Sequence, residues 1–560
     1  MGKVIFPCGC IFETVDPNEP DVTIEDRTNV KIPLIKLIDW ENIPRNCSLT
    51  YDEIFKKGDT KGVFQLENHL GQNWSAKVKP GNLNDIGALT AIIRPGCLHI
   101  KSGDPPKSMT QRFCDRKNKV EPITYIHPAL EPILGETYGI LVYQEQSIKI
   151  AQIIAGFNLQ QADILRKSIG KKDAKIMSSL EQDFIDGCKT VGLVTEEQAK
   201  ELFEQIRESQ RYSFNKSHAI SYGLISYWSA YAKAHYLMWF ICNYLYGAQW
   251  KGNKRHEEIY DLINNAKFFD IDVCVPTAKR LDEHFYIDGQ IIRFGLQDIK
   301  GVGDSIYAKY KRALKKIGKS ISEWTWNDYL FEFSDVAKLS TIHTAFISCG
   351  ALDFFGLCRR KMLYDLECWG VLTDKEKIWI KDNVDYRNIP LIDMIKLCCK
   401  TKKDGGGCHS ITRVGVLKEL LGEMVSPPKH KTTDSSAWIA VTEEFYLGVS
   451  VTCNKADAFL SHESVNTDCK KFAKSRSRKP AIMLVEIKNI NTTKTKNGKN
   501  PGSEMAFLKI ADSSYTLSSV VCFPEDWSIL KEKLKEGNVF VIYGERGKEG
   551  SLILKNAIEV

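Results

Sequence analysis

Residues 159–172 read LQQADILRKSIGKK, and this stretch decides how the first half of the chain is interpreted. Its apolar residues recur at steps of three and four, which predicts an amphipathic helix. They are Leu159, Ala162, Leu165 and Ile169. The helix ends in a cluster of cations made by Arg166, Lys167, Lys171 and Lys172. Such a cluster is typical either of a solvated helix end, where Asp163 pairs with Lys167, or of a binding site for an anion.

Helical periodicity continues on both sides of this stretch, from about residue 43 to residue 245. Residues 147–155 (SIKIAQIIA) have the spacing of a half-buried helix, and Gly156 is a suitable C-terminal stop. Residues 219–248 are the most membrane-like segment, but Lys233 and His235 lie at its centre. Because a charge there would cost ~2.5–3.5 kcal/mol in lipid, we expect a buried helix or pair of helices and no membrane partner.

The C-terminal residues follow a different period. Short β-rich runs separated by turns replace the helical spacing, and one helix is expected around residues 524–534. The runs are residues 481–487, 505–510, 518–523 and 539–543. Short strands with a single helix are the pattern of an OB-fold barrel, which has five strands. The sequence therefore predicts a multidomain chain that is mainly α-helical and ends in a β-barrel.

Composition changes suggest where the parts of the chain begin and end. We expect an N-terminal connector at 1–42, a helical region at 43–245, a smaller helical unit at 246–370, a linker region at 371–477 and the barrel at 478–560. A Gly-rich break and a Pro/Lys/Thr/Ser stretch lie in the linker region, and the basic run 470–479 marks its end. With 560 residues, about three to five domains are expected.

Composition places the chain among ordinary globular proteins. The apolar fraction is 43% and the charged fraction 26%. A net charge of +7 is small against 77 basic residues, so total charge alone does not indicate a nucleic-acid partner. The 17 cysteines have no regular spacing, which favours free thiols in a reducing cytoplasm. No secretory signal is recognisable in residues 1–13, so we expect a cytoplasmic protein.

A second polar motif, RYSFNKSH at 211–218, directly precedes the apolar stretch. The amide of Asn215, the ammonium of Lys216, the hydroxyl of Ser217 and the imidazole of His218 would then surround a helix N-terminus. Free N–H groups and the helix dipole favour anions there, so the motif suits a triphosphate. The alternative is simple capping by Ser213 or Ser217, which leaves Lys216 and His218 unexplained.

Two shorter motifs are less specific. Arg94 follows an apolar run in AIIRPGC at 91–97, and it is either a salt-bridge partner or a contact to phosphate or template. The motif LVYQEQ at 141–146 combines the ring of Tyr143, which can stack on a base or sugar, with the amides of Gln144 and Gln146. By itself this motif is also compatible with an ordinary helix start.

Together these motifs resemble the fingers of the bacterial C-family DNA polymerases, the DNA polymerase III alpha subunits. Six blocks occur in the family order and at family-like spacing. They are GVFQLE (62–67), IRPG (93–96), YGILVYQEQ (138–146), DILRK (163–167), GKK (170–172) and FNKSH (214–218). FGLQDIKGVG at 294–303 resembles the duplex-binding helix-hairpin-helix of the family, and SCGALD at 348–353 with Arg359 and Arg360 resembles the segment that follows. The resemblance runs from about residue 43 to residue 560 and covers the C-terminal half of such an enzyme.

The resemblance implies roles for particular residues. The incoming deoxynucleoside triphosphate is expected to bind Arg166, Lys167, Lys171, Lys172, Asn215, Lys216, Ser217 and His218. Template and base contacts are expected from Arg94, Tyr143, Gln144 and Gln146. Lys300, Gly301 and Gly303 are expected to hold the phosphates of primer–template DNA through charge and close backbone approach, although a tight turn alone would also use these glycines. In the barrel, Tyr515, Phe523 and Trp527 are either stacking platforms for a single strand or core residues, and a basic loop carries Lys494, Lys496 and Lys499.

The palm aspartates of the family, which hold two Mg²⁺ ions, have no clear counterpart. Asp270-Ile271-Asp272 lies beyond the fingers and is rejected, so Asp26 and Asp39 are the remaining candidates. Residues 1–42 are at most a palm remnant. We expect a second chain to carry the catalytic aspartates and most of the Mg²⁺, in a divided enzyme that would suit a mobile or viral genome.

Several alternatives remain open. One is a non-catalytic DNA-binding remnant of a polymerase, and another is a complete minimal polymerase with a divergent palm. A sliding-clamp partner is compatible with the family, but no clear clamp-binding motif is present. A zinc site built from Cys398, Cys399, Cys408 and His409 is a further option, weakened by the adjacent cysteines.

Overall fold

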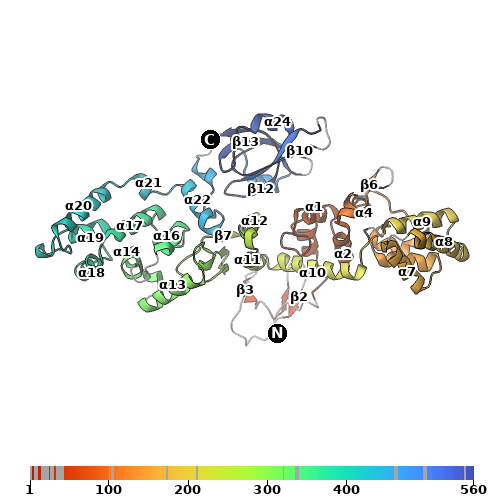
Figure 1. The fold of residues 1–560 in the computed structure, drawn as a ribbon, viewed down its shortest axis with the longest axis horizontal. Helices are drawn as coiled ribbons and strands as arrows, with labels where there is room; N and C mark the ends of the chain where they lie inside the picture. Colours follow the sequence, from red (N-terminus) through yellow and green to blue (C-terminus); the bar gives the residue numbers. More distant parts are fainter. Residues whose placement is uncertain are drawn as a thin grey trace. The chain divides into compact units, whose positions relative to one another are not determined.

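The computed structural model divides the chain into two compact units, Met1–Phe240 and Ile241–Val560 (Figure 1). It describes residues 3–5, 11–13, 24–25, 31–32, 43–99, 101–102, 106–171, 174–209, 212–318, 321–334, 340–459, 464–495, 501–547 and 550–560, and a few further side chains within these ranges are not described. Asp26, Asp39, Lys172, Arg211, Lys496 and Lys499 lie outside the described residues, and of Lys171 only the backbone is described.

The first unit is built mainly from helices. After two short hairpins, β1 (Lys3–Ile5) with β2 (Ile11–Glu13) and β3 (Ile24–Glu25) with β4 (Lys31–Ile32), it contains the following elements. They are η1 (Thr50–Phe55), α1 (His69–Val78), α2 (Leu83–Ile92), α3 (Pro95–His99), β5 (Lys101–Ser102), β6 (Lys107–Ser108), α4 (Met109–Lys117), η2 (Pro128–Leu130), α5 (Glu131–Leu134), η3 (Gly135–Thr137), α6 (Gln144–Ile154), α7 (Leu159–Lys171), α8 (Ala174–Val191), α9 (Glu196–Ser209) and α10 (Lys216–His235). Helix α7 confirms the amphipathic helix expected from residue 159 onward.

Helices α2 and α10 cross at two glycines in the core of this unit. A Cβ atom added to Gly223 would lie 3.0 Å from the backbone nitrogen of Gly87, so only glycine permits this approach. Helices α6, α7, α8 and α9 bury a second apolar cluster that includes Ile154, Leu165 and Phe184. This cluster is the orange and yellow helical group of Figure 1. The long helix α10 thus packs in the first of these two cores, with α2. Its N-terminus lies beside the start of α6.

The apolar stretch 219–248 consists of two helices, α10 and α11 (Leu237–Ala248), which meet at Tyr236. Within the described residues, no helix is long and apolar enough to span a membrane. Lys233 is fully buried in α10 and donates hydrogen bonds to the carbonyl oxygens of Asp59 (2.7 Å) and Lys61 (2.9 Å). Burial lowers the pKa of Lys233 to about 7. The lysine that argues against a membrane span thus fixes the loop before the block at 62–67.

The second unit begins with η4 (Gly252–Lys254), α12 (Arg255–Phe268) and a small sheet of order β7-β9-β8 (Asp272–Cys274, Ile291–Arg293 and Tyr286–Asp288). The sheet leads through η5 (Leu296–Asp298) into α13 (Asp304–Ile317). Next come η6 (Ile321–Glu323), α14 (Trp326–Asp328), η7 (Tyr329–Ser334), α16 (Ser340–Ser348), η8 (Asp353–Phe355), α17 (Arg359–Val371), α18 (Asp374–Asn383), α19 (Leu391–Cys398), η9 (Lys402–Asp404), α20 (Ile411–Val425), α21 (Lys429–Thr432), α22 (Ser436–Leu447), η10 (Lys455–Ala458) and α23 (Cys469–Lys474).

The region 371–477 differs from the linker that its composition suggests, because it contains helices α18 to α23. Several of these helices have N-termini capped by side chains, for example Thr373 at α18, Ser410 at α20 and Ser435 at α22. Helix α23 also buries Cys469 and Phe472 in the barrel core. The barrel thus includes residues that precede the expected boundary at 478.

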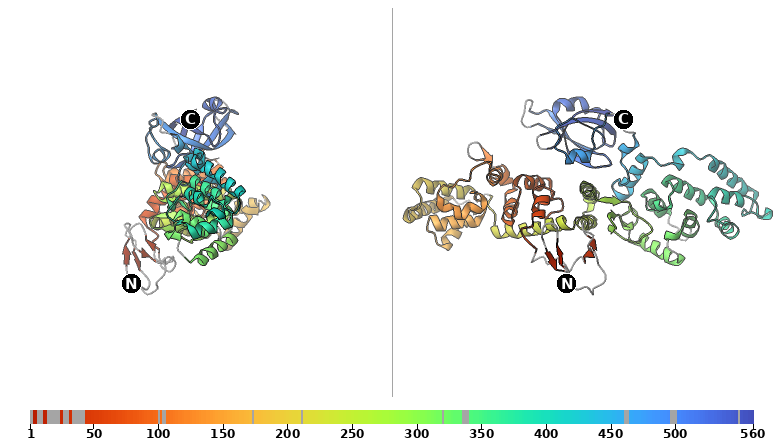
Figure 2. Two further views of the ribbon diagram at one scale, coloured as in Figure 1. Left: turned by 90° about the vertical axis from the view of Figure 1, so that its left-hand side faces the viewer. Right: turned by 180° about the vertical axis from the view of Figure 1, so that it is seen from behind.

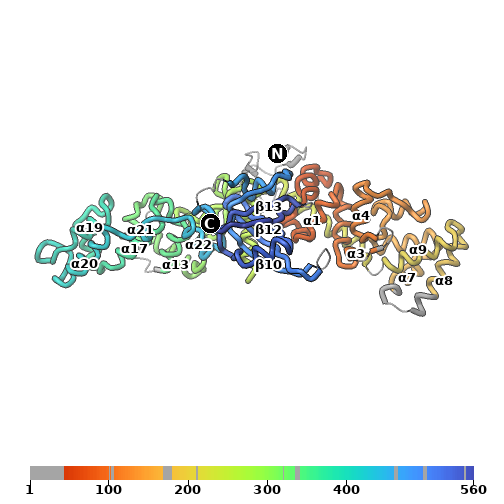
Figure 3. Tube along the Cα trace, turned by 90° about the horizontal axis from the view of Figure 1, so that it is seen from above, coloured from red at the N-terminus to blue at the C-terminus, as the bar shows by residue number. Residues whose placement is uncertain are grey.

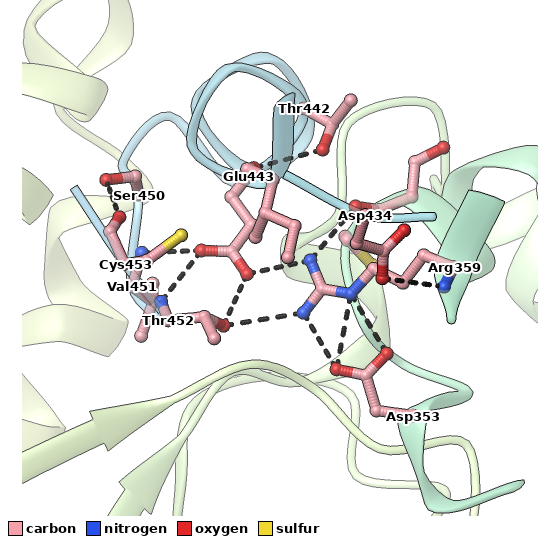
Figure 4. Close-up of polar contacts among 12 residues, drawn as sticks. Asp353, Arg359, Asp434, Thr442, Glu443, Ser450, Val451, Thr452 and Cys453 are labelled. Carbon is pink, nitrogen blue, oxygen red and sulfur yellow. Dashed lines mark hydrogen bonds and ion pairs between the residues drawn. The ribbon is translucent and has the colours of Figure 1, made fainter. Parts of the chain in front are cut away.

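A buried ion network joins three helical elements of this unit (Figure 4). The Arg359 guanidinium binds Asp353 (Nη2 to Oδ2, 2.7 Å) and Glu443 (Nη1 to Oε1, 2.8 Å), and the Arg359 and Glu443 side chains are 3% and 0% exposed. Glu443 also accepts hydrogen bonds from the backbone N–H groups of Val451 (2.7 Å) and Thr452 (2.8 Å). The network fixes the chain that leads from α22 towards the barrel.

The C-terminal strands form a closed barrel of order β10-β11-β12-β14-β13 (Figures 2 and 3). Their bounds are β10 (Ala481–Lys494), β11 (Glu504–Ala511), β12 (Thr516–Cys522), β13 (Val539–Arg546) and β14 (Leu552–Glu559), and α24 (Pro524–Leu530) lies between β12 and β13. Strand β10 pairs with β13 through its first half and with β11 through its second half. Five strands and one helix in this order confirm the expected OB-fold.

Candidate functional site

Two motifs that are 71 residues apart in the sequence lie side by side in the first unit. The backbone N–H of Gln144 donates to the carbonyl of Phe214 (3.0 Å), and the N–H of Phe214 donates to the carbonyl of Val142 (3.1 Å). This short bridge sets the start of α6 against the start of α10. The residues expected to contact the base and those expected to hold the triphosphate therefore share one site.

The N-terminus of α10 is capped by Asn215, not by Ser213 or Ser217 as the simple alternative supposed. The Asn215 side chain accepts a hydrogen bond from the backbone N–H of His218 (2.8 Å) and donates one to Glu145 (2.7 Å). The other Glu145 carboxylate oxygen accepts from the backbone N–H of Lys216 (2.9 Å). A carboxylate thus takes a helix N–H group that an anionic ligand would use.

The Lys216 ammonium forms an ion pair with Glu136, whose two carboxylate oxygens lie 2.7 and 2.8 Å from Nζ. About a third of each side chain is exposed. Neither Glu136 nor Glu145 is anticipated by the sequence analysis, although Glu145 lies inside the LVYQEQ motif. Together these two acids provide negative charge next to the groups expected to bind phosphate.

Tyr143 and Gln146 lie beneath the site rather than on its surface. Tyr143 is 1% exposed, and burial together with Glu136 and Glu145 raises its pKa, so the phenol stays neutral. The Gln146 carbonyl accepts from the N–H groups of Val142 (3.0 Å) and Tyr143 (2.9 Å). Its amide donates to Ile133 (3.2 Å) and Thr137 (2.8 Å), so Gln146 is fully engaged in holding the turn.

A row of aromatic rings follows the first turns of α10. His218 lies between Phe214 (ring centroids 5.2 Å apart) and Tyr222 (4.0 Å), and Tyr222 contacts Phe64 (5.2 Å). The Arg94 guanidinium lies over the Phe214 ring at 3.7 Å. Ser226 donates to the carbonyl of Phe64 (2.8 Å) and ties the 62–67 block to α10. Four of the six sequence blocks therefore converge on this face.

The fifth block reaches the site through Gln144. Arg166 donates to the Gln144 side chain (3.4 Å) and to Asp163 (2.9 Å), and Lys167 pairs with Asp163 (2.6 Å). The ion pair weighed in the sequence is thus present, and the two cations share a single carboxylate. The side chain of Lys171 and all of Lys172 lie outside the described residues.

The hairpin motif of the second unit is exposed at its glycines. Gly301 has a φ of +90° and Gly303 immediately precedes α13, and a Cβ atom added to either would meet nothing within 4 Å. The segment before the turn is the single 3₁₀ turn η5 rather than a full helix. Lys300 donates its backbone N–H to Tyr446 (2.7 Å) and places its ammonium 3.9 Å over the ring of Phe445. Phe445, 55% exposed, was not anticipated from the sequence.

The barrel aromatics separate into core and surface residues. Trp527 is 5% exposed inside the barrel, and Tyr515 packs against Phe268 of α12 (5.8 Å). Phe523 is 44% exposed, as is Phe507 of β11, which the sequence did not single out. Lys494 is exposed at the end of β10. Phe523 and Phe507 are thus the aromatic rings that remain available for stacking.

Those of the expected metal ligands that the structure describes do not form a metal site. Asp270 pairs with Lys470 (2.5 Å) and Lys474 (2.9 Å), which lower its pKa to about 2, and this agrees with rejecting it as a metal ligand. Cys408 donates to the carbonyl of Cys398 (3.2 Å), and His409 is exposed. Across the described residues, no group of three or more His, Cys, Asp or Glu side chains fits a metal ion, so neither the zinc cluster nor a Mg²⁺ site is formed there.

Comparison with known proteins links residues 23–192 to the finger domain of the bacterial DNA polymerase III alpha subunit. The DNA polymerase III subunit alpha of Aquifex aeolicus (strain VF5) is 31% identical over 93% of this chain and 39% of its own length. The protein of the same name from Bacillus subtilis (strain 168) is 29% identical over 93% of the chain and 41% of its own length. The protein of the same name from Ureaplasma parvum serovar 3 (strain ATCC 700970) is 35% identical over 59% of the chain and 32% of its own length. The chain spans about two fifths of the length of the first two relatives.

Proposed function

We propose that this chain, which resembles DNA polymerase III alpha subunits over most of its length, binds the incoming nucleotide and the DNA during template-directed synthesis by a C-family polymerase. The observation that carries this proposal is the convergence of separate sequence blocks at the N-terminus of α10, around Lys216 and the aromatic row. DNA binding alone would not require this arrangement. The proposal includes a cytoplasmic location for the chain, which its cysteines led us to expect.

The proposed nucleotide site works by charge and position. Lys216 is the first residue of α10, and a triphosphate would compete with Glu136 for its ammonium. Ser217 and His218 are exposed on the first turn and are available as hydrogen-bonding groups. Arg166 and Lys167 can add charge from α7, while Arg94 and the ring of Phe214 offer a surface to a base or template. In this scheme Tyr143, Gln144 and Gln146 hold the site in shape.

DNA is assigned to the second unit. Gly301 and Gly303 leave room for phosphates to approach the backbone at the start of α13, and Lys300 adds a cation. The exposed face of α13 continues the positive charge; its basic residues are Lys309, Lys311, Arg312, Lys315 and Lys316. Such contacts hold a duplex without reading its sequence. The barrel is assigned to single-stranded template, with exposed rings as stacking surfaces.

We further propose that the catalytic aspartates, and the Mg²⁺ ions that they would hold, are supplied by a second polypeptide. The pairing of Asp270 with two lysines supports this, because it removes the one Asp-x-Asp sequence from consideration. Mg²⁺ would activate the attacking hydroxyl and stabilise the leaving phosphates when bound. A sliding clamp is compatible with this assignment, although no residue of the chain specifies it.

Primer extension tests the proposal directly. The purified chain is mixed with primer–template DNA, Mg²⁺ and the four deoxynucleoside triphosphates, and nucleotide binding is measured in parallel with a fluorescent analogue. We expect nucleotide and DNA binding without extension, and extension after addition of the aspartate-bearing chain. Extension by the chain alone would favour the complete minimal polymerase and direct mutagenesis to Asp26 and Asp39. DNA binding without nucleotide binding would favour the non-catalytic remnant.

A further inference from the structure

A hollow lined by three arginines lies on the barrel, apart from the groups assigned above. Its volume is about 480 Å³, and its walls are Arg476, Arg478, Arg546, Gly547 and Gly550. Arg476 and Arg478 belong to the basic run before β10, and Arg546 is the last residue of β13. Because Ala481 of β10 pairs with Gly544 of β13, these two segments are neighbours in the barrel.

Arg546 is held in place but not neutralised. Its guanidinium lies 4.0 Å over the ring of Phe472, and Nη1 donates to the carbonyl of Gly550 (3.1 Å) while Nη2 donates to the carbonyl of Phe472. Its Nε atom is buried and has no hydrogen-bond partner among the residues that the structure describes. A rigid, partly buried guanidinium with an unused donor is ready to bind an acceptor.

The neighbouring lysines differ from the arginines in their partners. Lys470 and Lys474 pair with Asp270, and Lys471 pairs with Asp468 at 2.9 Å. By contrast, none of the three arginines forms an ion pair with any carboxylate in the described part of the chain. Among the described residues, the arginines of this basic run that line the hollow are therefore left without a carboxylate partner.

Guanidinium groups match phosphate oxygens in geometry as well as charge, since they donate two parallel hydrogen bonds. Gly547 and Gly550, the latter with a φ of +86°, contribute backbone rather than side chains to the wall of the hollow. We propose that this hollow binds a phosphate group of a single-stranded nucleic acid held by the barrel. The identity of the strand rests on the proposed function, whereas the phosphate chemistry rests on the three arginines.

The test compares four forms of the full chain. They are the parent, Arg476→Gln/Arg478→Gln, the charge-preserving Arg476→Lys/Arg478→Lys and the control Lys531→Gln/Lys533→Gln. The control removes the same charge from exposed residues after α24. Binding of an oligo-dT single strand is measured at several salt concentrations, and inorganic pyrophosphate binding is measured by calorimetry. Because all four side chains are exposed, the variants are expected to fold, which a thermal melt checks.

We expect Arg476→Gln/Arg478→Gln to weaken oligo-dT binding at least tenfold near 0.1 M salt. The slope of log affinity against log salt should fall by about 1 to 1.5, since each single-strand phosphate contact contributes about 0.7. The lysine variant should keep the slope and lose part of the affinity, and the control should resemble the parent.

The contrary outcomes are distinct. An unchanged slope in Arg476→Gln/Arg478→Gln, with the parent binding oligo-dT normally, would overturn the hollow as a strand site and leave the proposed function standing. Pyrophosphate binding that depends on the arginines, in a chain that does not bind oligo-dT, would assign the hollow to a free phosphate and reject the strand. If the chain bound neither oligo-dT nor pyrophosphate, the inference would be overturned. Binding of the fluorescent nucleotide at Lys216 would still test the proposed function separately.

Discussion

The Lys216 ammonium lies 2.7 Å from the Glu136 carboxylate, at the helix end where the triphosphate is proposed to bind. The ammonium expected to bind phosphate is therefore already paired with an acid of the chain. Under the proposed function, nucleotide binding would exchange one anion for another at Lys216, and its strength would depend on how easily Glu136 leaves this lysine. This relationship gives the first prediction.

Replacing Glu136 with Gln should raise triphosphate affinity. A partly exposed pair contributes about 0.2–1 kcal/mol, which corresponds to an increase of up to about fivefold. Lys216→Gln should lower the affinity by tenfold or more. Titration with a fluorescent deoxynucleotide measures both effects. The control is Glu196→Gln, which removes an exposed partner of Lys200 (2.8 Å) in α9 and should leave affinity unchanged. Equal affinity of Glu136→Gln and the parent would contradict competition at this lysine.

Duplex affinity should depend on the Lys300–Phe445 pair. Lys300→Gln removes one phosphate contact, so the salt slope of duplex binding should fall by about 0.9. Phe445→Ala removes the ring on which the ammonium rests and should weaken binding with a smaller change in slope. Fluorescence anisotropy with a primer–template duplex measures both values. Lys396→Gln in α19, an exposed lysine paired with Asp393, is the matched control. If Lys300→Gln kept the salt slope of the parent, Lys300 would not be part of the proposed duplex interface.

The hairpin motif at residues 294–303 should lose stability as the pH rises above neutrality. The hydrogen bond to Asp298 raises the pKa of His284 above the value of about 6.5 expected in an unfolded chain. The folded state therefore binds its proton more tightly, and this stabilisation is complete below about pH 6.5 and is lost as the pH passes the raised value. Asp298 also accepts from the N–H of Gly295 (2.9 Å) at the base of the turn.

Urea unfolding of the parent and His284→Asn between pH 6 and pH 8.5 checks this prediction. The difference in unfolding free energy between the two proteins should shrink as the pH rises. A difference that stays constant across this range would show that His284 has the same pKa in the folded and unfolded states and that the bond to Asp298 does not depend on protonation.

Arg359→Met should destabilise the second unit by about 3–5 kcal/mol, because it leaves the buried Glu443 carboxylate without its cation. Urea unfolding gives the total effect. Hydrogen exchange gives its location, since the amides of Val451 and Thr452, which donate to Glu443, should exchange faster. Lys381→Met, which breaks an exposed pair with Glu332 (3.0 Å), is the control and should cost less than about 1 kcal/mol. Unchanged exchange at these amides would mean that Arg359 does not position the segment.

The sequence predicted the elements whose signals are local. The apolar spacing from Leu159 gave α7, and the change of period after residue 478 gave the barrel with its helix. The region 371–477 was less legible, because helices such as α20 have exposed apolar residues, including Ile411 at 82%, and therefore weak amphipathic patterns. Ser410 and Ser435, which cap α20 and α22, are the residues in this region that indicate helix starts.

The candidate site was predicted in part. The motifs at 141–146 and 214–218 were recognised, but spacing cannot show that Val142 and Phe214 pair through their backbones. The roles of the Glu136 and Glu145 carboxylates depend on that pairing, so the sequence alone does not indicate them. Tyr143 and Gln146 were chosen for their chemistry, and only the fold reveals that they face inward. Trp527 likewise carries an aromatic ring suited to stacking, but the barrel interior encloses it.

The closure of the barrel also determines how other molecules can recognise it. Strand β10 is paired on one side with β13 and on the other with β11, and the ring is completed by β12, β14 and β13. Because the ring is closed, none of its five described strands is an edge strand, which disfavours docking by extension of the sheet and edge-to-edge aggregation. Recognition of the barrel has to use side chains and loops, which are the parts of the sequence that can change without disturbing the hydrogen bonds of the sheet.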